Sequence, residues 1–377
     1  MDFALSEEQL LLRDSVTRLL ADHNDFEARG RAMREPDGFS RAMWQRYAEL
    51  GLLGLPFAEQ DGGSGGGPIE TMIVMEAFGG ALALEPYLAT LVLGGSALRL
   101  GGKALLLPKI AAGDMLVAFA HAEPQSRYDL ADVATTARRD GSAFILDGTK
   151  TLVLHGASAD QFVVSARLSG ARRDQAGLGL FLIDAKADGV SRRGYPTIDG
   201  QRAAEVTLSN TRIEADAVVG EPGNAFPLIE RVADIAIAAL CAEAVGCMAA
   251  MQELTVEYLK TRKQFGVPIG NFQVLQHKAA DMLIALEQAR SMAMLAAMMA
   301  DEPDAAERRK AMSAAKVQIG RSGRLIGKEA VQLHGGIGMT DEYKIGHYFK
   351  RVTVIDTLFG DADHHLGILA RGDGLIS

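Results

Sequence analysis

A basic segment that interrupts two long apolar stretches is the part of this sequence best suited to bind a charged ligand. The segment, called the elbow below, is Thr261-Arg-Lys-Gln-Phe-Gly-Val-Pro-Ile-Gly-Asn-Phe-Gln273. Arg262 and Lys263 fall in the predicted last turn of the preceding helix, where cations complement the helix dipole. Gly266 and Pro268 end that helix. The elbow is therefore either a capped connection between two helices or a site that presents a guanidinium to an anionic group such as a phosphate.

A second segment, called the glycine turn below, is Gln332-Leu-His-Gly-Gly-Ile-Gly-Met339. Its glycines have no side chains, so a ligand can approach the backbone closely. Together the elbow and the glycine turn resemble the C-terminal signatures of acyl-CoA dehydrogenases. The resemblance extends to residues around the two segments, namely Gln276, Ala280, Asp281, Met282, Tyr348, Lys350 and Arg351.

In that family both segments reach across a subunit interface to the ADP part of the FAD that is bound to the neighbouring chain. The resemblance therefore implies FAD as the cofactor. The residues that match the family's cofactor contacts are Arg262, Phe265, Gln332, Gly335 and Gly336. The implied contacts make chemical sense, because a guanidinium can bind two pyrophosphate oxygens at once.

The resemblance also implies a reaction, the oxidation of an acyl-CoA to the trans-2-enoyl-CoA. A carboxylate would remove the α-proton while the β-hydrogen moves as hydride to the flavin, and hydrogen bonds to the thioester oxygen would acidify the α-carbon. Electron-transfer flavoprotein is the acceptor that the family uses, and we expect it here.

A narrower resemblance, to the small subunit of pimeloyl-CoA dehydrogenases, implies a dicarboxylyl-CoA substrate and a heterotetramer with a large subunit. A homo-oligomer is the alternative assembly. The narrower resemblance is carried by Glu49-Leu-Gly-Leu-Leu-Gly-Leu-Pro-Phe57, Glu70-Thr-Met-Ile-Val-Met-Glu-Ala-Phe-Gly79 and Thr357-Leu-Phe-Gly-Asp-Ala-Asp-His-His-Leu366.

The position of the catalytic base departs from the family pattern. Most members carry a glutamate in a Tyr-Glu-Gly-Thr segment, which is matched here by Leu358-Phe-Gly-Asp361, so Phe359 occupies the base position. A minority carry the base on the helix before the elbow, where this chain has Ala236. Neither side chain can accept a proton.

Two other carboxylates are candidates for the base. Glu243 follows Ala236 by nearly two helical turns, so it lies on the same helix face about 10 Å further along. A desolvated glutamate suits a general base, but a glutamate paired structurally with an arginine or histidine is an equally good explanation. Asp361, just beyond Phe359, is the second candidate, and Asp234 is a candidate contact to the substrate.

The segments expected to face the flavin ring are also atypical. The family's Glu-Pro-Gly-x-Gly-Ser-Asp is matched by Glu123-Pro-Gln-Ser-Arg-Tyr-Asp129, and its Trp-Ile-Thr-Asn by Leu152-Val-Leu-His155. The segments that would contact a neighbouring chain's cofactor keep the family pattern, while the segments expected around the flavin ring depart from it. Three roles stay open: a catalytic subunit of a heteromer, a structural subunit that completes its partner's flavin site, and a homo-oligomer that uses Glu243 or Asp361.

The hydrophobic pattern predicts an α+β chain with an N-terminal helical domain (1–115), a middle β-barrel-like domain (116–224) and a C-terminal four-helix domain (225–377). Ser6 begins the first helix with a capping box. Residues alternate with period two in the middle domain, and Asp140-Gly141 and Asp147-Gly148 are predicted hairpin turns. The C-terminal helices have apolar faces that need a partner chain.

Composition narrows the class of protein. A net charge of −9 and a pI near 5.5 argue against a nucleic-acid partner. Cys241 and Cys247 are expected to be buried thiols, with no metal site. The stretch Val232–Met251 is long enough to span a bilayer, but its two carboxylates would each cost about 2.5 to 3.5 kcal/mol near the centre, so we expect a buried helix and no membrane contact. The N-terminus lacks a signal-peptide pattern, and we expect a cytoplasmic protein.

Overall fold

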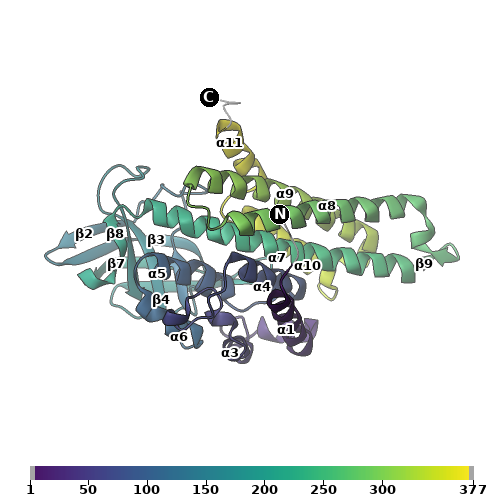
Figure 1. The fold of residues 1–377 in the computed structure, drawn as a ribbon, viewed down its shortest axis with the longest axis horizontal. Coiled ribbons are helices and arrows are strands. Elements are labelled where there is room, and N and C mark those ends of the chain that lie inside the picture. The colour runs from purple at the N-terminus through teal and green to yellow at the C-terminus, as the bar shows by residue number, and fades with distance from the viewer. Residues whose placement is uncertain (1–4, 373–377) are drawn as a thin grey trace. The chain divides into compact units, whose positions relative to one another are not determined.

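The computed structural model describes residues 5–372, and its elements are labelled in Figure 1. The chain divides into two compact units. The helical unit takes the residues up to Gly30, then Pro68–Ala83, and everything from Ile237 onward. The sheet unit takes Arg31–Gly67 and Leu84–Ala236.

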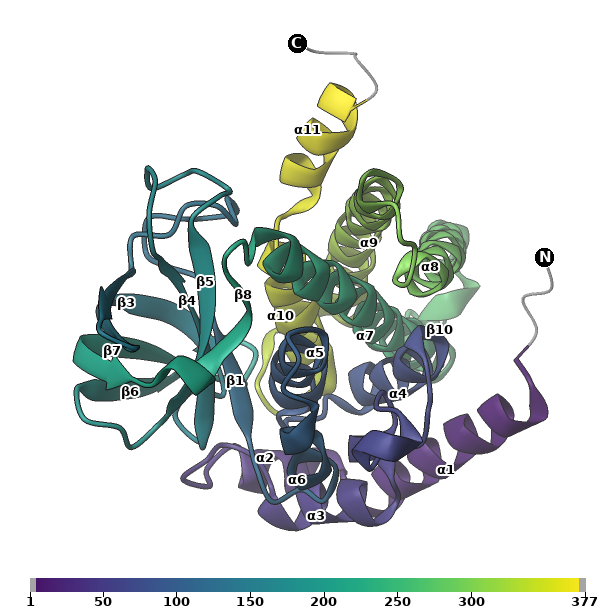
Figure 2. The ribbon, with the colours of Figure 1, turned by 60° about the vertical axis from the view of Figure 1, so that its left-hand side comes forward.

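The C-terminal part of the helical unit is built from long helices packed side by side, as Figures 1 and 2 both show. Helix α9 packs against α8, α10 and α11, which confirms the predicted helical C-terminal domain. The bounds are α7 (Phe226–Thr261), whose first residues belong to the sheet unit, α8 (Gln273–Met299), α9 (Ala305–His334), α10 (Lys344–Thr357) and α11 (Ala362–Gly372).

The N-terminal part of the helical unit contains α1 (Glu7–His23) and α4 (Pro68–Ala81), which pack against each other, while α2 (Phe26–Ala32) leads into the sheet unit. The predicted capping box is confirmed. The Ser6 Oγ accepts from the Gln9 N–H at 3.2 Å, and the Gln9 Oε1 accepts from the Ser6 N–H at 3.0 Å.

Helices α4 and α7 are in backbone contact because each has glycine where they cross. A Cβ atom built on Gly79 would lie 1.9 Å from the Glu243 carbonyl oxygen, and one built on Gly246 would lie 1.9 Å from the Glu76 carbonyl oxygen. No other residue type fits at that separation. This close approach sets the position of the α7 segment that carries Glu243.

Replacing Gly246 with alanine should lower the free energy of unfolding by about 1 to 3 kcal/mol, because the new methyl group would overlap the Glu76 backbone. Gly367→Ala is the matched control, since a Cβ there meets only the end of the Arg371 side chain at 3.7 Å. Urea unfolding followed by circular dichroism measures both changes. Equal stability of Gly246→Ala and the wild type would contradict the backbone contact.

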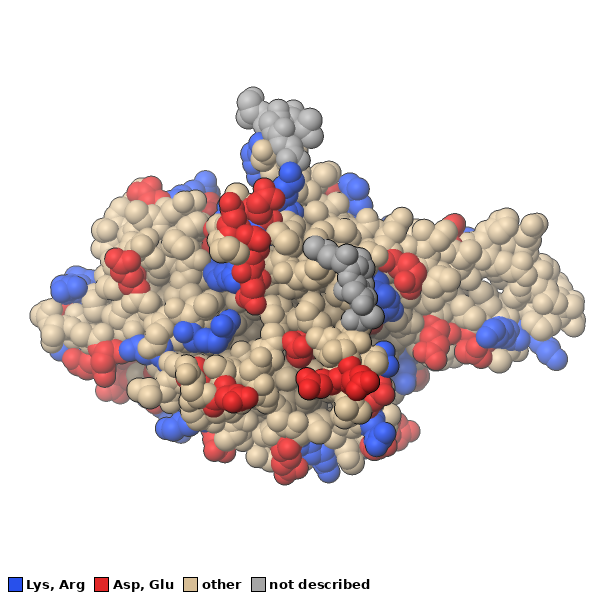
Figure 3. Space-filling model, in the orientation of Figure 1, with Lys and Arg blue, Asp and Glu red and all other residues tan. Residues whose placement is uncertain are grey.

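Helix α8 exposes an apolar face. Its outward-facing side chains, all more than a third exposed, are Val274, Leu283, Ile284, Leu295 and Met298. Figure 3 shows few charges over this part of the surface. Helices α7 and α8 are both long and apolar enough to cross a membrane by length and composition alone, but most of the apolar window of α7 is buried inside the protein.

The helical part of the sheet unit consists of short elements around buried aromatic residues such as Trp44 and Tyr47. A buried π-helical stretch, η3, passes directly into α5. The bounds are α3 (Arg41–Glu49), η1 (Leu52–Gly54), η2 (Glu59–Asp61), η3 (Leu88–Gly95), α5 (Ser96–Leu100), η4 (Ala104–Leu106) and α6 (Leu107–Ala111).

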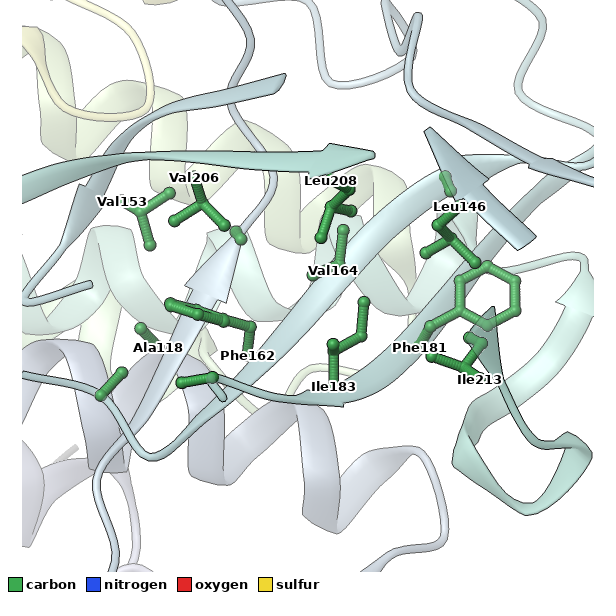
Figure 4. Packing of buried hydrophobic residues seen from close by; sticks show 14 of the residues in the cluster. Ala118, Leu146, Val153, Phe162, Val164, Phe181, Ile183, Val206, Leu208 and Ile213 are labelled. Carbon is green, nitrogen blue, oxygen red and sulfur yellow. The ribbon is translucent and has the colours of Figure 1, made fainter. Parts of the chain in front are cut away.

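The rest of the sheet unit is an eight-stranded sheet with the order β6-β7-β3-β2-β4-β5-β8, in which β1 also pairs with β4. Its inward-facing side chains form one apolar cluster that includes Phe162, Val164 and Phe181 (Figure 4). The strands are β1 (Val117–Ala120), β2 (Thr136–Asp140), β3 (Ala143–Leu154), β4 (Gln161–Arg167), β5 (Leu178–Asp184), β6 (Val190–Pro196), β7 (Arg202–Ile213) and, after η5 (Ala215–Ala217), β8 (Val218–Gly223).

One of the two predicted hairpin turns is confirmed and the other is wrong. Asp140 and Gly141 connect the antiparallel strands β2 and β3. Asp147 and Gly148 instead lie inside β3, where the register with β7 shifts between Leu146 and Gly148. The backbone at Gly148 needs a residue without a side chain, since a Cβ would lie 2.4 Å from the Thr135 Oγ1. The local Asp-Gly signal therefore marks a β-bulge.

Candidate functional site

The elbow forms a small hairpin that projects from the ends of α7 and α8. Strands β9 (Lys263–Gln264) and β10 (Val267–Pro268) pair with each other, and the short helix η6 (Ile269–Asn271) leads into α8. Phe265 and Gly266 have φ values of +54° and +82°, as a tight two-residue hairpin turn requires. The sequence predicted a helix end here and not a hairpin.

The elbow presents its functional side chains to solvent. Phe265 is 90% exposed and contacts only Phe272 edge-to-face, with ring centroids 6.0 Å apart. The Arg262 backbone N–H donates to the Tyr258 carbonyl at 2.8 Å, which fixes the main chain. The Arg262 side chain is exposed, and its guanidinium makes no hydrogen bond or ion pair within residues 5–372. A cation held this way is available to an anion outside the chain.

The glycine turn is equally open. Helix α9 ends at His334, and η7 (Gly335–Met339) follows, with Gly335 at φ +65°. Nothing in the described part of the chain lies within 4 Å of a Cβ built on Gly335 or Gly336, and Gln332 is exposed. All five residues expected to contact the cofactor are therefore exposed in this chain, on two segments of the helical unit.

The turn Leu358–Asp361 lies at the family's base position. Side chains from outside this turn hold it in a fixed conformation. The ammonium group of Lys316, which is fully buried on α9, donates to the carbonyl oxygens of Ile355 and Leu358 at 2.7 and 3.0 Å. Burial lowers the pKa of Lys316 to about 8. The Phe359 carbonyl accepts from the His365 Nε2 at 3.1 Å.

His365 is neutral in this arrangement. Its Nε2 is the donor to Phe359, so its Nδ1 accepts from the Ser313 hydroxyl at 3.0 Å. Burial, reinforced by the charge of Lys316, lowers the pKa of His365 to about 3. These contacts hold Phe359 at φ +58°, a conformation that bulky residues rarely adopt. The main chain of the base position is thus specified in detail although its side chain cannot take a proton.

Glu243 is paired with an arginine. Its two carboxylate oxygens accept from the Nε and one terminal nitrogen of Arg351 at 2.6 and 2.7 Å, and both residues are buried. Removing either partner would leave a buried charge without compensation. This geometry favours the structural explanation for Glu243 over the role of general base.

The other two candidate carboxylates are also engaged. The Asp361 Oδ1 accepts from the His364 backbone N–H at 2.8 Å and so caps the start of α11. Asp234 is 4% exposed, lies in the sheet-unit segment of α7 and makes contacts within the protein. No observation connects Asp234 to a substrate.

A buried polar network, not anticipated from the sequence, holds the two segments expected near the flavin ring. Lys150 on β3 donates to the Glu123 carboxylate at 2.6 Å and to the Ser165 hydroxyl at 3.0 Å. Ser165 in turn contacts the His121 Nδ1 at 2.9 Å. Glu123 also accepts from the backbone N–H groups of Ala134 and Thr135. The network therefore links the end of β1, the following loop, β3 and β4.

Glu123 and Lys150 form the charged pair at the centre of the network. Burial acts to raise the pKa of Glu123, but the charge and hydrogen bond of Lys150 outweigh it and lower the pKa to about 2. Burial lowers the pKa of Lys150 to about 8. Burial and the charge of Lys150 together lower the pKa of His121 to about 3. The pair is charged and His121 is neutral near neutral pH.

The segments fixed by this network carry unusual backbone conformations. Arg127, Leu152 and His155 all have positive φ, at +46°, +49° and +51°. Leu152, which stands where the family has tryptophan, is 41% exposed, while the Ser126 hydroxyl and the Gln125 amide are used in hydrogen bonds to Glu123. The loop retains a specified shape, but few of its polar side chains remain available to a flavin ring.

Glu123→Gln should reduce the acid sensitivity of the fold. Since folding lowers the pKa of Glu123 from 4.5 to about 2, its stabilisation is complete above pH 4.5 and is lost as the pH falls through 2. The shift corresponds to at most about 3 kcal/mol. Chemical unfolding between pH 5 and 2 should give a flatter profile for Glu123→Gln, with lower stability at neutral pH because Lys150 loses its partner.

Glu205→Gln is the control for that experiment, because Glu205 forms an exposed ion pair with Arg193. Its pH profile should follow the wild type. A Glu123→Gln profile parallel to the wild type over the same range would contradict the assigned role of Glu123.

Models of the three acyl-CoA dehydrogenase domains match almost the whole chain: the N-terminal domain over residues 6–114, the middle domain over 118–212 and the C-terminal domain over 227–373. The chain therefore belongs to the acyl-CoA dehydrogenase family. It is an oxidoreductase of the class that dehydrogenates acyl-CoA thioesters with FAD as cofactor, as expected from the elbow and the glycine turn.

Two curated relatives illustrate the range of the family. Acyl-CoA dehydrogenase FadE12 of Mycobacterium tuberculosis is 31% identical over 91% of this chain and 90% of its own length. Acryloyl-CoA reductase (NADH) of Anaerotignum propionicum is 28% identical over 98% and 95%.

Two solved structures share the fold over nearly their full lengths. A variant of the Tcur3481-Tcur3483 steroid ACAD has a TM-score of 0.88 and 29% identity, with 98% of both chains covered. PigA with FAD and proline has a TM-score of 0.90 and 27% identity, with 100% of both chains covered.

The residues present fit FAD in one half of its site. The exposed guanidinium of Arg262 and the open backbone at Gly335 and Gly336 suit the pyrophosphate and adenosine parts of the cofactor. On the side expected to face the flavin ring, the exposed Leu152 is apolar and has no side-chain group that could form a hydrogen bond.

Proposed function

We propose that this chain is a subunit of a heteromeric FAD-dependent acyl-CoA dehydrogenase that completes the flavin site of a partner chain and supplies no catalytic base of its own. One observation carries the proposal. The turn Leu358–Asp361 keeps a fully specified backbone around Phe359, whereas the residues expected to bind a neighbour's cofactor are exposed.

The engagement of the remaining carboxylates supports the absence of a base. A general base must be within hydrogen-bond reach of the substrate proton, either directly or through one water. Glu243 is occupied by Arg351 through both oxygens, and Asp361 caps a helix. In the proposed assembly, the carboxylate that removes the α-proton belongs to the partner chain.

The exposed apolar face of α8 supports assembly with a second chain of similar fold. Large apolar side chains exposed along one helix are typical of a protein interface. The matched chain of the Tcur3481-Tcur3483 steroid ACAD, whose name joins two proteins, shares the fold over 98% of its length. A heterotetramer of two such chains and two larger ones is the assembly that we propose, with electron-transfer flavoprotein as the electron acceptor.

In this assembly the residues of this chain bind and orient the cofactor. Arg262 would contact the pyrophosphate of the partner's FAD through two nitrogens, and the backbone at Gly335 and Gly336 would lie against the same part of the cofactor. Phe265 would also contact the cofactor. The bound flavin would accept the hydride.

We further propose a dicarboxylyl-CoA such as pimeloyl-CoA as the substrate. The support is the sequence resemblance to pimeloyl-CoA dehydrogenase small subunits. A panel of acyl-CoA thioesters matched in length, with and without a terminal carboxylate, tests it: flavin bleaching should be fastest with the dicarboxylyl compound. Equal or faster bleaching with the thioesters that lack the terminal carboxylate would rule the proposal out.

Arg262→Glu should lower the FAD content of the purified assembly, because it replaces a charge-assisted contact, worth about 1.5 to 3 kcal/mol, with repulsion. The helix content of the chain should not change, since the Arg262 side chain has no partner within residues 5–372. Flavin absorbance per chain is the measurement. Arg324→Glu, on an exposed position of α9 paired with Asp356, is the charge-matched control. Full flavin content in Arg262→Glu would remove the elbow from the cofactor site.

Asp361→Asn and Glu243→Gln should leave the rate constant of acyl-CoA-dependent flavin bleaching unchanged in assemblies that remain folded. Glu243→Gln is expected to be less stable, because Arg351 loses its charged partner. Loss of a general base typically slows the reaction by about 10² to 10⁴-fold. Such a loss in either variant, with flavin still bound, would show that this chain carries the base and would favour the homo-oligomer.

A further inference from the structure

His334 of the glycine turn contacts the rings of two tyrosines, one of which lies just before the elbow. The His334 ring is stacked on the Tyr258 ring, with centroids 4.5 Å apart and planes at 30°. The Tyr343 ring lies 5.1 Å from the His334 ring, with the planes at 47°. His334 is 3% exposed, so both contacts are largely protected from water. Ring pairs at such separations each stabilise a structure beyond the area that they bury.

Each of the three rings belongs to a different segment of the proposed cofactor site or its support. Tyr258 lies one helical turn before Arg262, and its carbonyl accepts the Arg262 backbone N–H. His334 is directly followed by Gly335. Tyr343 is the residue from which α10 begins. The stack therefore joins the end of α7, the end of α9 and the start of α10.

The orientation of His334 is fixed by its own helix and by the glycine turn. Its Nδ1 donates to the Ala330 carbonyl at 2.8 Å. A Cβ built on Gly338 would lie 3.1 Å from the His334 Cβ, so η7 folds closely over the histidine. Burial lowers the pKa of His334, against the effect of the Ala330 and Leu254 carbonyls. This shift favours the neutral form of the ring.

We propose that His334 is a positioning residue that sets the spacing between Arg262 and the backbone of Gly335 and Gly336, so that both segments can contact one FAD held by a partner chain. The inference rests on the proposed function. Two segments can bind one rigid ligand tightly only if their separation is set before the ligand arrives. No backbone hydrogen bond between the elbow and the glycine turn occurs among the described residues, so side chains must supply that constraint.

The test uses three variants in the purified assembly, with FAD as the probe. His334→Ala removes the stack and the Nδ1 hydrogen bond, and His334→Phe keeps a ring at this position. Ile319→Ala truncates a buried side chain on the same helix about 20 Å away, and is the control for a simple loss of stability. The dissociation constant for FAD is measured by flavin fluorescence after removal of the bound cofactor, together with hydrogen exchange in the elbow and the glycine turn.

His334→Ala should raise the dissociation constant for FAD about fivefold to tenfold and accelerate exchange in both segments, as expected for the loss of two ring contacts. His334→Phe should restore the affinity to within about twofold, and Ile319→Ala should lower the melting temperature without weakening FAD binding. Wild-type affinity in His334→Ala, in an assembly where Arg262→Glu loses FAD, overturns the positioning role and leaves the proposed function standing. Wild-type affinity for FAD in both His334→Ala and Arg262→Glu overturns the positioning role and the proposed function together.

Discussion

A charge buried inside a protein has to be satisfied there, and this requirement organises the structure around its candidate site. Three buried charged groups are satisfied in three ways. Glu123 pairs with a lysine, Glu243 pairs with an arginine, and Lys316 donates to backbone carbonyls. Each fixes a segment that the family uses for catalysis or cofactor binding. Since an unpaired partner would carry a large desolvation cost, these segments are held more firmly than their loop-like sequences suggest.

The division of the site into a buried and an exposed part follows from the same requirement. Around the base position, Lys316 and His365 hold the main chain and Asp361 caps α11. The elbow and the glycine turn instead leave a guanidinium and open backbone at the surface, where water satisfies them until a ligand does. An arrangement that is complete inside and incomplete outside is expected of a chain that works only within an assembly.

The fold class could be predicted from the sequence because it depends on local patterns. The capping box at Ser6 and the apolar periodicity of the long helices depend on residues close together in the chain. The failures depend on distant partners. Asp147-Gly148 has the composition of a turn, but pairing with β7 makes it a bulge. Lys316 gave no sequence signal, because its carbonyl acceptors lie about 40 residues further along the chain. The role of Glu243 could not be predicted from the sequence, because its partner Arg351 lies far along the chain.

The support of the base-position turn by Lys316 and His365 has a consequence for how such proteins diversify. Because the main chain at Phe359 is set by side chains outside the turn, the residue at that position can change from an acid to a phenylalanine without rebuilding its surroundings. A duplicated gene can therefore lose catalysis in one step and still encode a chain that folds and assembles. The same independence would keep the change reversible, so that a single substitution could return an acid to a turn whose main chain is already in place.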